Sequence, residues 1–122
     1  MKRQWKLFVQ DIYDAIRYIK EFVGNMNRKE FLSDEKTRSA VAFKIENIGE
    51  ASKNIPKAIR AKYKDLPWSD MARMRDKITH FYFGIDYEIV WTVLKKDLPA
   101  IEPTIAKLLN ELKESEGKKK RK

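Results

Sequence analysis

The stretch Arg75-Asp76-Lys77-Ile78-Thr79-His80-Phe81-Tyr82 decides how the fold and the chemistry of this chain are interpreted. It contains the single histidine among 122 residues, and it lies in a segment whose apolar residues recur at steps of three and four. Such spacing places these residues on one face of a helix. The predicted core positions are Met71, Met74, Ile78 and Phe81. We therefore predict a helix that is capped by Ser69 or Asp70 and ends at Gly84.

Three further segments show the same helical spacing. The first is expected to end near Gly24, the second to be capped by Ser33 or Asp34, and the third to be capped by Asp86. Their apolar stripes are Trp5, Phe8, Ile12, Ala15, Ile19 and Phe22; Val41, Ile45, Ile48, Ser52 and Ile55; and Trp91, Leu94, Leu98, Ile101, Ile105, Leu108 and Leu112. The residues between Gly24 and Ser33 are predicted to form a polar connection.

The prolines predict where helices break or restart. Pro56 breaks or restarts a helix, so residues 56–63 are predicted to form a short extra helix, and Pro99 with Pro103 predicts a kink or restart within residues 97–103. No segment shows the two-residue alternation of a strand. The predicted fold is all-α, an antiparallel four-helix bundle with a short extra helix. A coiled coil is the alternative, but the short connections favour a bundle.

Length, charge and cysteine content narrow the class of protein. The chain is predicted to be one domain, residues 1–116, followed by a basic disordered tail, residues 117–122. That tail holds five of the nine net positive charges, and it is either a solubilising end or an electrostatic tether to nucleic acid. There is no cysteine and no apolar run long enough to span a bilayer, so we expect a cytoplasmic protein without a membrane segment.

If the helix predicted to end at Gly84 is regular, His80 faces away from the core. Asp76 lies four residues earlier on the same outward face, where its carboxylate is placed to accept a hydrogen bond from the imidazole. Arg75 lies about 140° around the helix from His80, so the two side chains do not converge within one regular helix. A surface histidine without a catalytic role is the plainer alternative.

One metal-free reaction uses these residue types: attack of an RNA 2′-hydroxyl on the adjacent phosphate. Histidine suits proton transfer near neutral pH, and arginine binds phosphate oxygens with two donors. Because a single histidine does not easily make both proton transfers, we expect a two-fold dimer that brings two copies of Arg75 and His80 to one cleft. Arg73, Lys77 and Tyr82 are predicted to contact RNA.

Other site types are less favoured by the sequence. One histidine with scattered carboxylates lacks the ligand spacing of a zinc site, so neither a metal nor a cofactor is predicted. Glu46 and Glu50 are one turn apart and could bind a cation, but pairing with a lysine such as Lys53 is the more frequent arrangement. The aromatic run 81–83 could stack on bases, although aromatic residues at a helix end more often lie in the core.

The spacing of Arg75, His80 and Tyr82 resembles the RxxxxHxY motif of the HEPN superfamily, and in particular of HepT-like toxins. The resemblance extends over nearly the whole chain and leaves out only the basic tail. The flanking pieces that carry it are Ile48-Gly49-Glu50-Ala51, Pro67-Trp68, Phe83-Gly84-Ile85-Asp86, Val90-Trp91 and Asp97-Leu98-Pro99.

This resemblance implies a HEPN-like, metal-independent endoribonuclease that acts as a homodimer with its cleft at the two-fold interface. It assigns Arg75 and His80 as the catalytic pair and places Asp76 where the family carries a polar residue. It also implies that the protein is a toxin paired with a nucleotidyltransferase antitoxin of the MntA type. Such a partner transfers AMP to the motif tyrosine, here Tyr82, and thereby blocks the RNA cleft.

Two alternatives remain at the level of the sequence. The chain could be a noncatalytic subunit that binds nucleotide or RNA for a partner nucleotidyltransferase. It could also be an oligomerisation or adaptor bundle without either activity.

Overall fold

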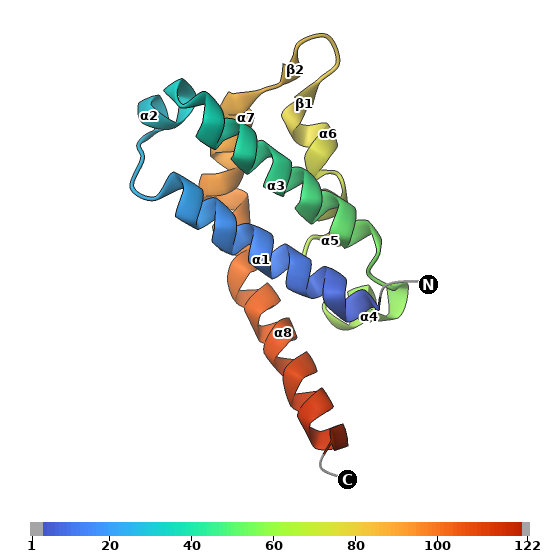
Figure 1. Cartoon of the computed structure of the whole chain (residues 1–122). Coiled ribbons are helices and arrows are strands. Elements are labelled where there is room, and N and C mark those ends of the chain that lie inside the picture. The colour runs from blue at the N-terminus through green and yellow to red at the C-terminus, as the bar shows by residue number, and fades with distance from the viewer. Residues whose placement is uncertain (1–3, 121–122) are drawn as a thin grey trace.

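The computed structural model describes residues 4–120 of the chain, with side chains as far as Ser115, and it confirms the all-α fold. Helices α1 (Trp5–Val23) and α3 (Glu35–Lys53) lie side by side, and α8 (Leu98–Lys120) packs against α1 and then extends beyond both (Figure 1). The buried apolar side chains of these helices join one continuous core. A small β-hairpin protrudes at the end of the molecule opposite the C-terminal end of α8.

Helix α1 ends where the sequence predicts. Gly24 has a φ of +52°, a conformation that glycine adopts without a steric cost, and its N–H donates to the Lys20 carbonyl at 2.9 Å. The predicted core face is only partly right, because the Phe22 side chain is 37% exposed. Val23 is buried instead, and the buried face continues through Ile16 and Ile19.

A helix, α2 (Arg28–Ser33), occupies the segment that was predicted to be a polar connection, and that prediction was wrong. It begins with a capping box: the Asn27 side chain accepts from the Glu30 N–H at 2.8 Å, and the Glu30 carboxylate accepts from the Asn27 N–H at 3.0 Å. Phe31 from this helix is fully buried, with its ring 5.3 Å from that of Trp91. The segment therefore contributes to the core.

Helix α3 confirms its predicted cap and its predicted core face. The Asp34 side chain accepts from the Thr37 N–H at 2.9 Å, and every residue of the predicted stripe is buried. Gly49 faces the segment that leads into the motif: a Cβ atom at this position would lie 3.4 Å from the Met71 carbonyl oxygen and 3.6 Å from the Arg75 nitrogen. A methyl group would fit at Gly49 in ordinary van der Waals contact, but a longer side chain would meet this backbone.

The short extra helix is present as α4 (Lys57–Lys62), directly after Pro56. Tyr63 at its end joins two parts of the chain, since its carbonyl accepts from the Trp68 indole at 3.0 Å and its hydroxyl donates to the Glu111 carboxylate on α8. This hydrogen bond to a carboxylate raises the pKa of Tyr63 from 10.0 to about 12. The contribution of the bond to stability is therefore fully present below pH 10 and is lost as the pH rises from 10 through about 12.

The prediction of one long helix that is capped by Ser69 or Asp70 and ends at Gly84 was wrong in its start, its continuity and its end. The chain forms α5 (Trp68–Ala72), with Pro67 rather than Ser69 or Asp70 at the N-cap, then breaks at Arg73 and continues as α6 (Met74–Ile78). From there it enters β1 (Thr79–His80), which pairs antiparallel with β2 (Gly84–Ile85). The β-branched and aromatic residues after Ile78 favour extended backbone, and Gly84 adopts a φ of +78° at the start of β2.

This hairpin changes the predicted core. Met71, Met74 and Ile78 are buried as expected, but Phe81 is 91% exposed instead of packed inside. The Asp86 N–H donates to the Ile78 carbonyl at 2.7 Å and closes the hairpin at its base. The Thr79 hydroxyl donates to the Arg75 carbonyl at 2.7 Å, which binds the first strand back onto α6.

The last part of the chain is helical but irregular. Helix α7 (Tyr87–Thr92) has the predicted cap, since the Asp86 side chain accepts from the Glu88 N–H at 3.0 Å. A π-helical turn, η1 (Val93–Asp97), follows it, and α8 then runs through Pro103 without a break. Pro99 has no N–H for the Lys95 carbonyl, and the wider π turn just before it accommodates that missing bond. The predicted irregularity therefore starts before Asp97.

The division into a body of residues 1–116 and a basic tail stays a prediction. The backbone of α8 is helical as far as Lys120. Residues 121–122 and the side chains of residues 116–120 lie outside the described part of the chain.

Substitution of Gly49 tests the close approach between α3 and the motif segment. A Cβ at this site would make ordinary van der Waals contacts, so Gly49→Ala is expected to leave the fold intact and to gain from the better helix propensity of alanine. Gly49→Leu has no room and is expected to lower the free energy of unfolding by about 1–3 kcal/mol, as overpacked sites do. Urea unfolding of both variants measures the difference, and equal stability would contradict this packing.

Candidate active site

The motif residues lie at the junction of α6 and the protruding hairpin. In β1 and β2, Thr79 pairs with Ile85 and His80 pairs with Gly84, and the three residues between the strands form the tip. The aromatic side chains at the tip are far more exposed than any other large apolar side chain of the described residues, at 91% for Phe81 and 84% for both Tyr82 and Phe83. The prediction that aromatics here lie in the core was therefore wrong.

His80 is exposed, as predicted, although it lies on a strand and not on a helix. It has no hydrogen bond or ion pair within the described residues, and its ring lies 5.9 Å from that of Phe83. Among the described residues, the predicted hydrogen bond from the His80 imidazole to the Asp76 carboxylate is absent. Because α6 ends at Ile78, Asp76 and His80 are not one helical turn apart and do not share a face. Both nitrogens of the imidazole are therefore open to a ligand.

Arg75 lies on α6 with an exposed side chain that has no ion pair among the described residues. Its carbonyl accepts a hydrogen bond from the Thr79 hydroxyl, and its backbone nitrogen lies near Gly49 of α3. Among the described residues, no hydrogen bond or ring contact joins the side chains of Arg75 and His80, and their convergence in a dimer stays a prediction. The guanidinium is free to bind an anion.

The predicted RNA-contacting cations differ in how they are engaged. Lys77 forms an ion pair with Asp97 at 2.6 Å, and Arg73 lies 3.5 Å from Asp70. Together with Asp76, residues of this cluster line a shallow depression of about 420 Å³. Exposed pairs of this kind contribute little to stability, and contact of Arg73 and Lys77 with RNA stays a prediction.

A second depression, of about 450 Å³, opens beside His80. Phe83 lines it from the hairpin, Tyr87 and Glu88 from α7, and Arg38 from α3. Arg38 was not among the site residues predicted from the sequence. No spacing rule connects a residue on α3 with a histidine more than forty positions later, and only the folded chain brings them together.

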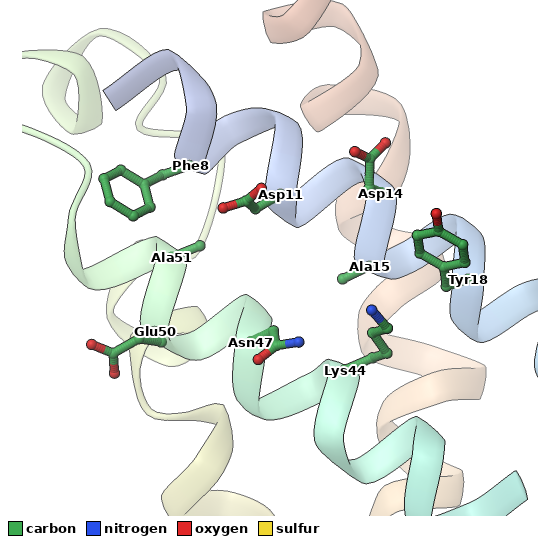
Figure 2. Close-up of a pocket in the computed structure, with 9 residues that line it drawn as sticks. All are labelled: Phe8, Asp11, Asp14, Ala15, Tyr18, Lys44, Asn47, Glu50 and Ala51. Carbon is green, nitrogen blue, oxygen red and sulfur yellow. The ribbon is translucent and has the colours of Figure 1, made fainter. Parts of the chain in front are cut away.

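A third depression, of about 400 Å³, follows the groove between α1 and α3 (Figure 2). It is lined by carboxylates, including Asp11, Asp14 and Glu50, and the Lys44 ammonium lies over the Tyr18 ring at 4.7 Å. None of the motif residues lines this groove. Three of its lining residues are acidic and one is basic, and this excess of negative charge does not suit an RNA backbone.

The described residues contain neither a cluster of metal ligands nor a membrane-spanning helix. Glu50 pairs with Lys53 at 3.9 Å, as expected for the plainer interpretation of the two glutamates on α3. Within the described residues, no three histidine or acidic side chains gather as metal ligands, and metal-independent chemistry stays a prediction. No helix among residues 4–120 has the length and hydropathy needed to cross a membrane.

Comparison with known proteins identifies the family. Residues 12–108 match the family model described as "Ribonuclease HepT-like". The chain is 44% identical over 108 residues to "Probable ribonuclease HepT" of Thermococcus cleftensis, covering 88% of this chain and 98% of that protein. It is 44% identical over 98 residues to a Methanocaldococcus jannaschii protein whose name includes the term RNase, covering 80% and 81% of the two chains. A second such protein of that organism is 42% identical over 117 residues, covering 96% and 94%.

No solved structure gives a significant match to the chain. The family model nevertheless spans the core helices, α6 and the hairpin. The chain therefore belongs to the HepT-like ribonuclease family of HEPN type.

Proposed function

We propose that this chain is the toxin of a toxin–antitoxin pair and acts as a metal-independent endoribonuclease. The single observation that carries the proposal is the state of the motif residues. Arg75, His80 and Tyr82 are all exposed at the junction of α6 and the hairpin, and the side chains of Arg75 and His80 have no hydrogen bond or ion pair among the described residues. The family and the RNase names of its relatives support RNA as the substrate.

The proposed reaction needs only these side chains. The RNA 2′-hydroxyl attacks the adjacent phosphorus, its proton passes to a general base, and the 5′-oxygen leaves with a proton from a general acid, which yields a 2′,3′-cyclic phosphate. An imidazole such as that of His80 suits both proton transfers, because it has one nitrogen that can accept a proton and one that can donate it. The guanidinium of Arg75 stabilises the additional negative charge on the phosphate oxygens.

A homodimer is part of the proposal, because one chain supplies one histidine for two proton transfers. The lack of any contact between Arg75 and His80 within the chain supports a cleft shared by two copies. A two-fold axis beside the hairpin would double both groups and place them around one phosphate.

Regulation by a nucleotidyltransferase antitoxin completes the proposal. The Tyr82 hydroxyl is accessible at the tip of the hairpin, where it can attack the α-phosphate of ATP so that pyrophosphate leaves and AMP remains on the tyrosine. The added phosphate brings negative charge and bulk next to the groups that bind the substrate phosphate, and both effects oppose RNA binding.

The second candidate is a noncatalytic subunit that binds RNA or nucleotide for a partner nucleotidyltransferase. The same exposed cations and aromatic residues would serve it. It predicts binding without any RNA product.

Removal of either catalytic side chain is expected to abolish cleavage without unfolding the protein. His80→Ala and Arg75→Ala should each lower kcat by about 10²- to 10⁴-fold, as loss of an acid–base or charge-stabilising group does. The melting temperature should stay unchanged, because both side chains are exposed. Cleavage of a single-stranded RNA in EDTA is the measurement, and Arg17→Ala, an exposed arginine on α1, is the matched control. Cleavage by purified His80→Ala would contradict the assignment.

Subunit mixing tests the shared cleft. If one cleft needs both copies of His80, wild-type subunits mixed and equilibrated with a ninefold excess of His80→Ala subunits will be found mostly in inactive mixed dimers. Activity per wild-type subunit should then fall about tenfold. Activity that stays proportional to the amount of wild-type protein would show that each chain acts alone.

Mass spectrometry tests the regulatory step. After incubation with the cognate nucleotidyltransferase and ATP, the wild-type chain should gain one or more AMP-sized increments and lose cleavage activity. Tyr82→Phe should gain none and stay active. Tyr18→Phe, which removes another exposed phenol on α1, should behave as the wild type. Increments on the Tyr82→Phe protein would place the modification elsewhere.

A further inference from the structure

We propose that the depression beside His80 is a subsite for one unpaired nucleobase of the RNA, with the Phe83 ring as its stacking surface. The inference rests on the proposed ribonuclease function and adds a substrate class, single-stranded RNA with an unpaired base next to the cleaved bond. Its volume of about 450 Å³ lies within the range of small-molecule sites and is sufficient for a nucleotide. His80 lies on its rim, so a base held there keeps the adjoining phosphate close to the imidazole.

Phe83 has the properties of a stacking residue. It is 84% exposed and lies outside the hydrophobic core, and its ring lies 5.9 Å from the His80 ring at a tilt of 56°. Burial of an exposed, unpacked apolar side chain against a flat aromatic group removes apolar surface from water and is therefore favourable. Every nucleobase offers such a surface, and base-on-aromatic stacking is the usual way in which proteins hold unpaired nucleotides.

Arg38 supplies a fixed polar group in the lining of the depression. One of its terminal nitrogens donates to the Leu32 carbonyl at 2.7 Å, and the guanidinium lies over the Tyr87 ring at 4.5 Å. The other terminal nitrogen has only a 4.0 Å contact with Glu35. The side chain is therefore held in place while part of its donor capacity is unused, which suits recognition of the acceptor atoms on a base edge.

The charges around the depression favour a base over a phosphate. Glu88 and Asp86 line it together with Arg38, and Glu88 is paired with Arg28. Carboxylates therefore balance the guanidinium groups, and no surplus positive charge is left for a phosphate. Arg75, by contrast, is unpaired and lies outside this depression. A neutral aromatic group is thus expected in the depression, and the phosphate is expected toward Arg75.

Phe81, at the same hairpin tip, is a matched control for Phe83. Phe81 is as exposed as Phe83, at the same tip, but it does not line the depression and instead meets the Tyr82 ring edge-on at 5.0 Å. A general requirement for apolar residues at the tip would involve both phenylalanines equally. A base subsite involves only Phe83.

The experiment uses the full-length wild-type chain and a short single-stranded oligonucleotide in 2′-O-methyl form, which cannot be cleaved by attack of a 2′-hydroxyl. One position carries 2-aminopurine, whose fluorescence is quenched when it stacks. Wild-type protein and Phe81→Ala should quench the probe and bind it with the same Kd. Phe83→Ala should lose the quenching and raise the Kd by roughly tenfold or more, and Phe83→Trp should restore both.

An oligonucleotide with an abasic site at the probe position separates base stacking from backbone binding. Wild type and Phe83→Ala should bind it equally well. The proposal is overturned if Phe81→Ala and Phe83→Ala lose affinity to the same extent, if the Phe83→Ala defect persists with the abasic probe, or if the wild type does not bind and quench the probe.

Sedimentation velocity on the same variants examines the competing occupant, a second copy of this chain. Phe83→Ala should sediment as the wild type does, and loss of an oligomer in this variant would assign the ring to a protein interface and overturn the subsite. Failure of the proposed function is seen separately, as absence of cleavage of the unmodified RNA in an assay that does not depend on the quenching result.

Discussion

The hydrogen bond from the Asp86 N–H to the Ile78 carbonyl is the constraint on which the exposed site depends. It joins the end of α6 to the start of α7 and makes the seven residues between them a hairpin. Ile78 is fully buried below this bond, and the Asp86 side chain caps α7 above it, so the base of the hairpin is anchored in the core on both sides. Everything beyond the base projects into solvent. The same bond that ends the helix therefore exposes His80 and the tip.

Much of the fold could be predicted from local sequence because local interactions determine it. Gly24, Asp34 and Asp86 end or begin helices through contacts within a few residues, and the spacing of apolar residues identifies the buried face of α3. Helix α2 was missed although Asn27 and Glu30 have the spacing of a capping box, so its signal was present in the sequence. The hairpin is different. Phe81 continues the helical period, but the pairing of β1 with β2 and the bond between Asp86 and Ile78, eight residues apart, replace the helix.

The candidate site shows the same division between local and distant information. The motif spacing identified Arg75, His80 and Tyr82 without any knowledge of the hairpin, and their exposure agrees with a role in binding. The predicted partnership of Asp76 with His80 assumed a helix that ends too early to form it. Arg38 could not be linked to His80, because the depression that they share is formed by α3, α7 and the hairpin together. Spacing along the chain carries no information about such a contact.

The lack of hydrogen bonds that orient the motif side chains limits how the site can function. Catalytic groups are usually held by hydrogen bonds that fix their orientation, and here Arg75 and His80 have none within the described chain. Rigid backbone supplies part of the order, through Gly49 behind Arg75 and the short sheet beneath His80. The remaining order has to come from whatever covers the hairpin. A second chain that contributes another Arg75 and His80, and an RNA base on Phe83, would each limit the freedom of these side chains. Under the proposed function, dimerisation and substrate binding would complete one site together, and AMP on Tyr82, which lies between His80 and Phe83 in the sequence, would oppose RNA binding.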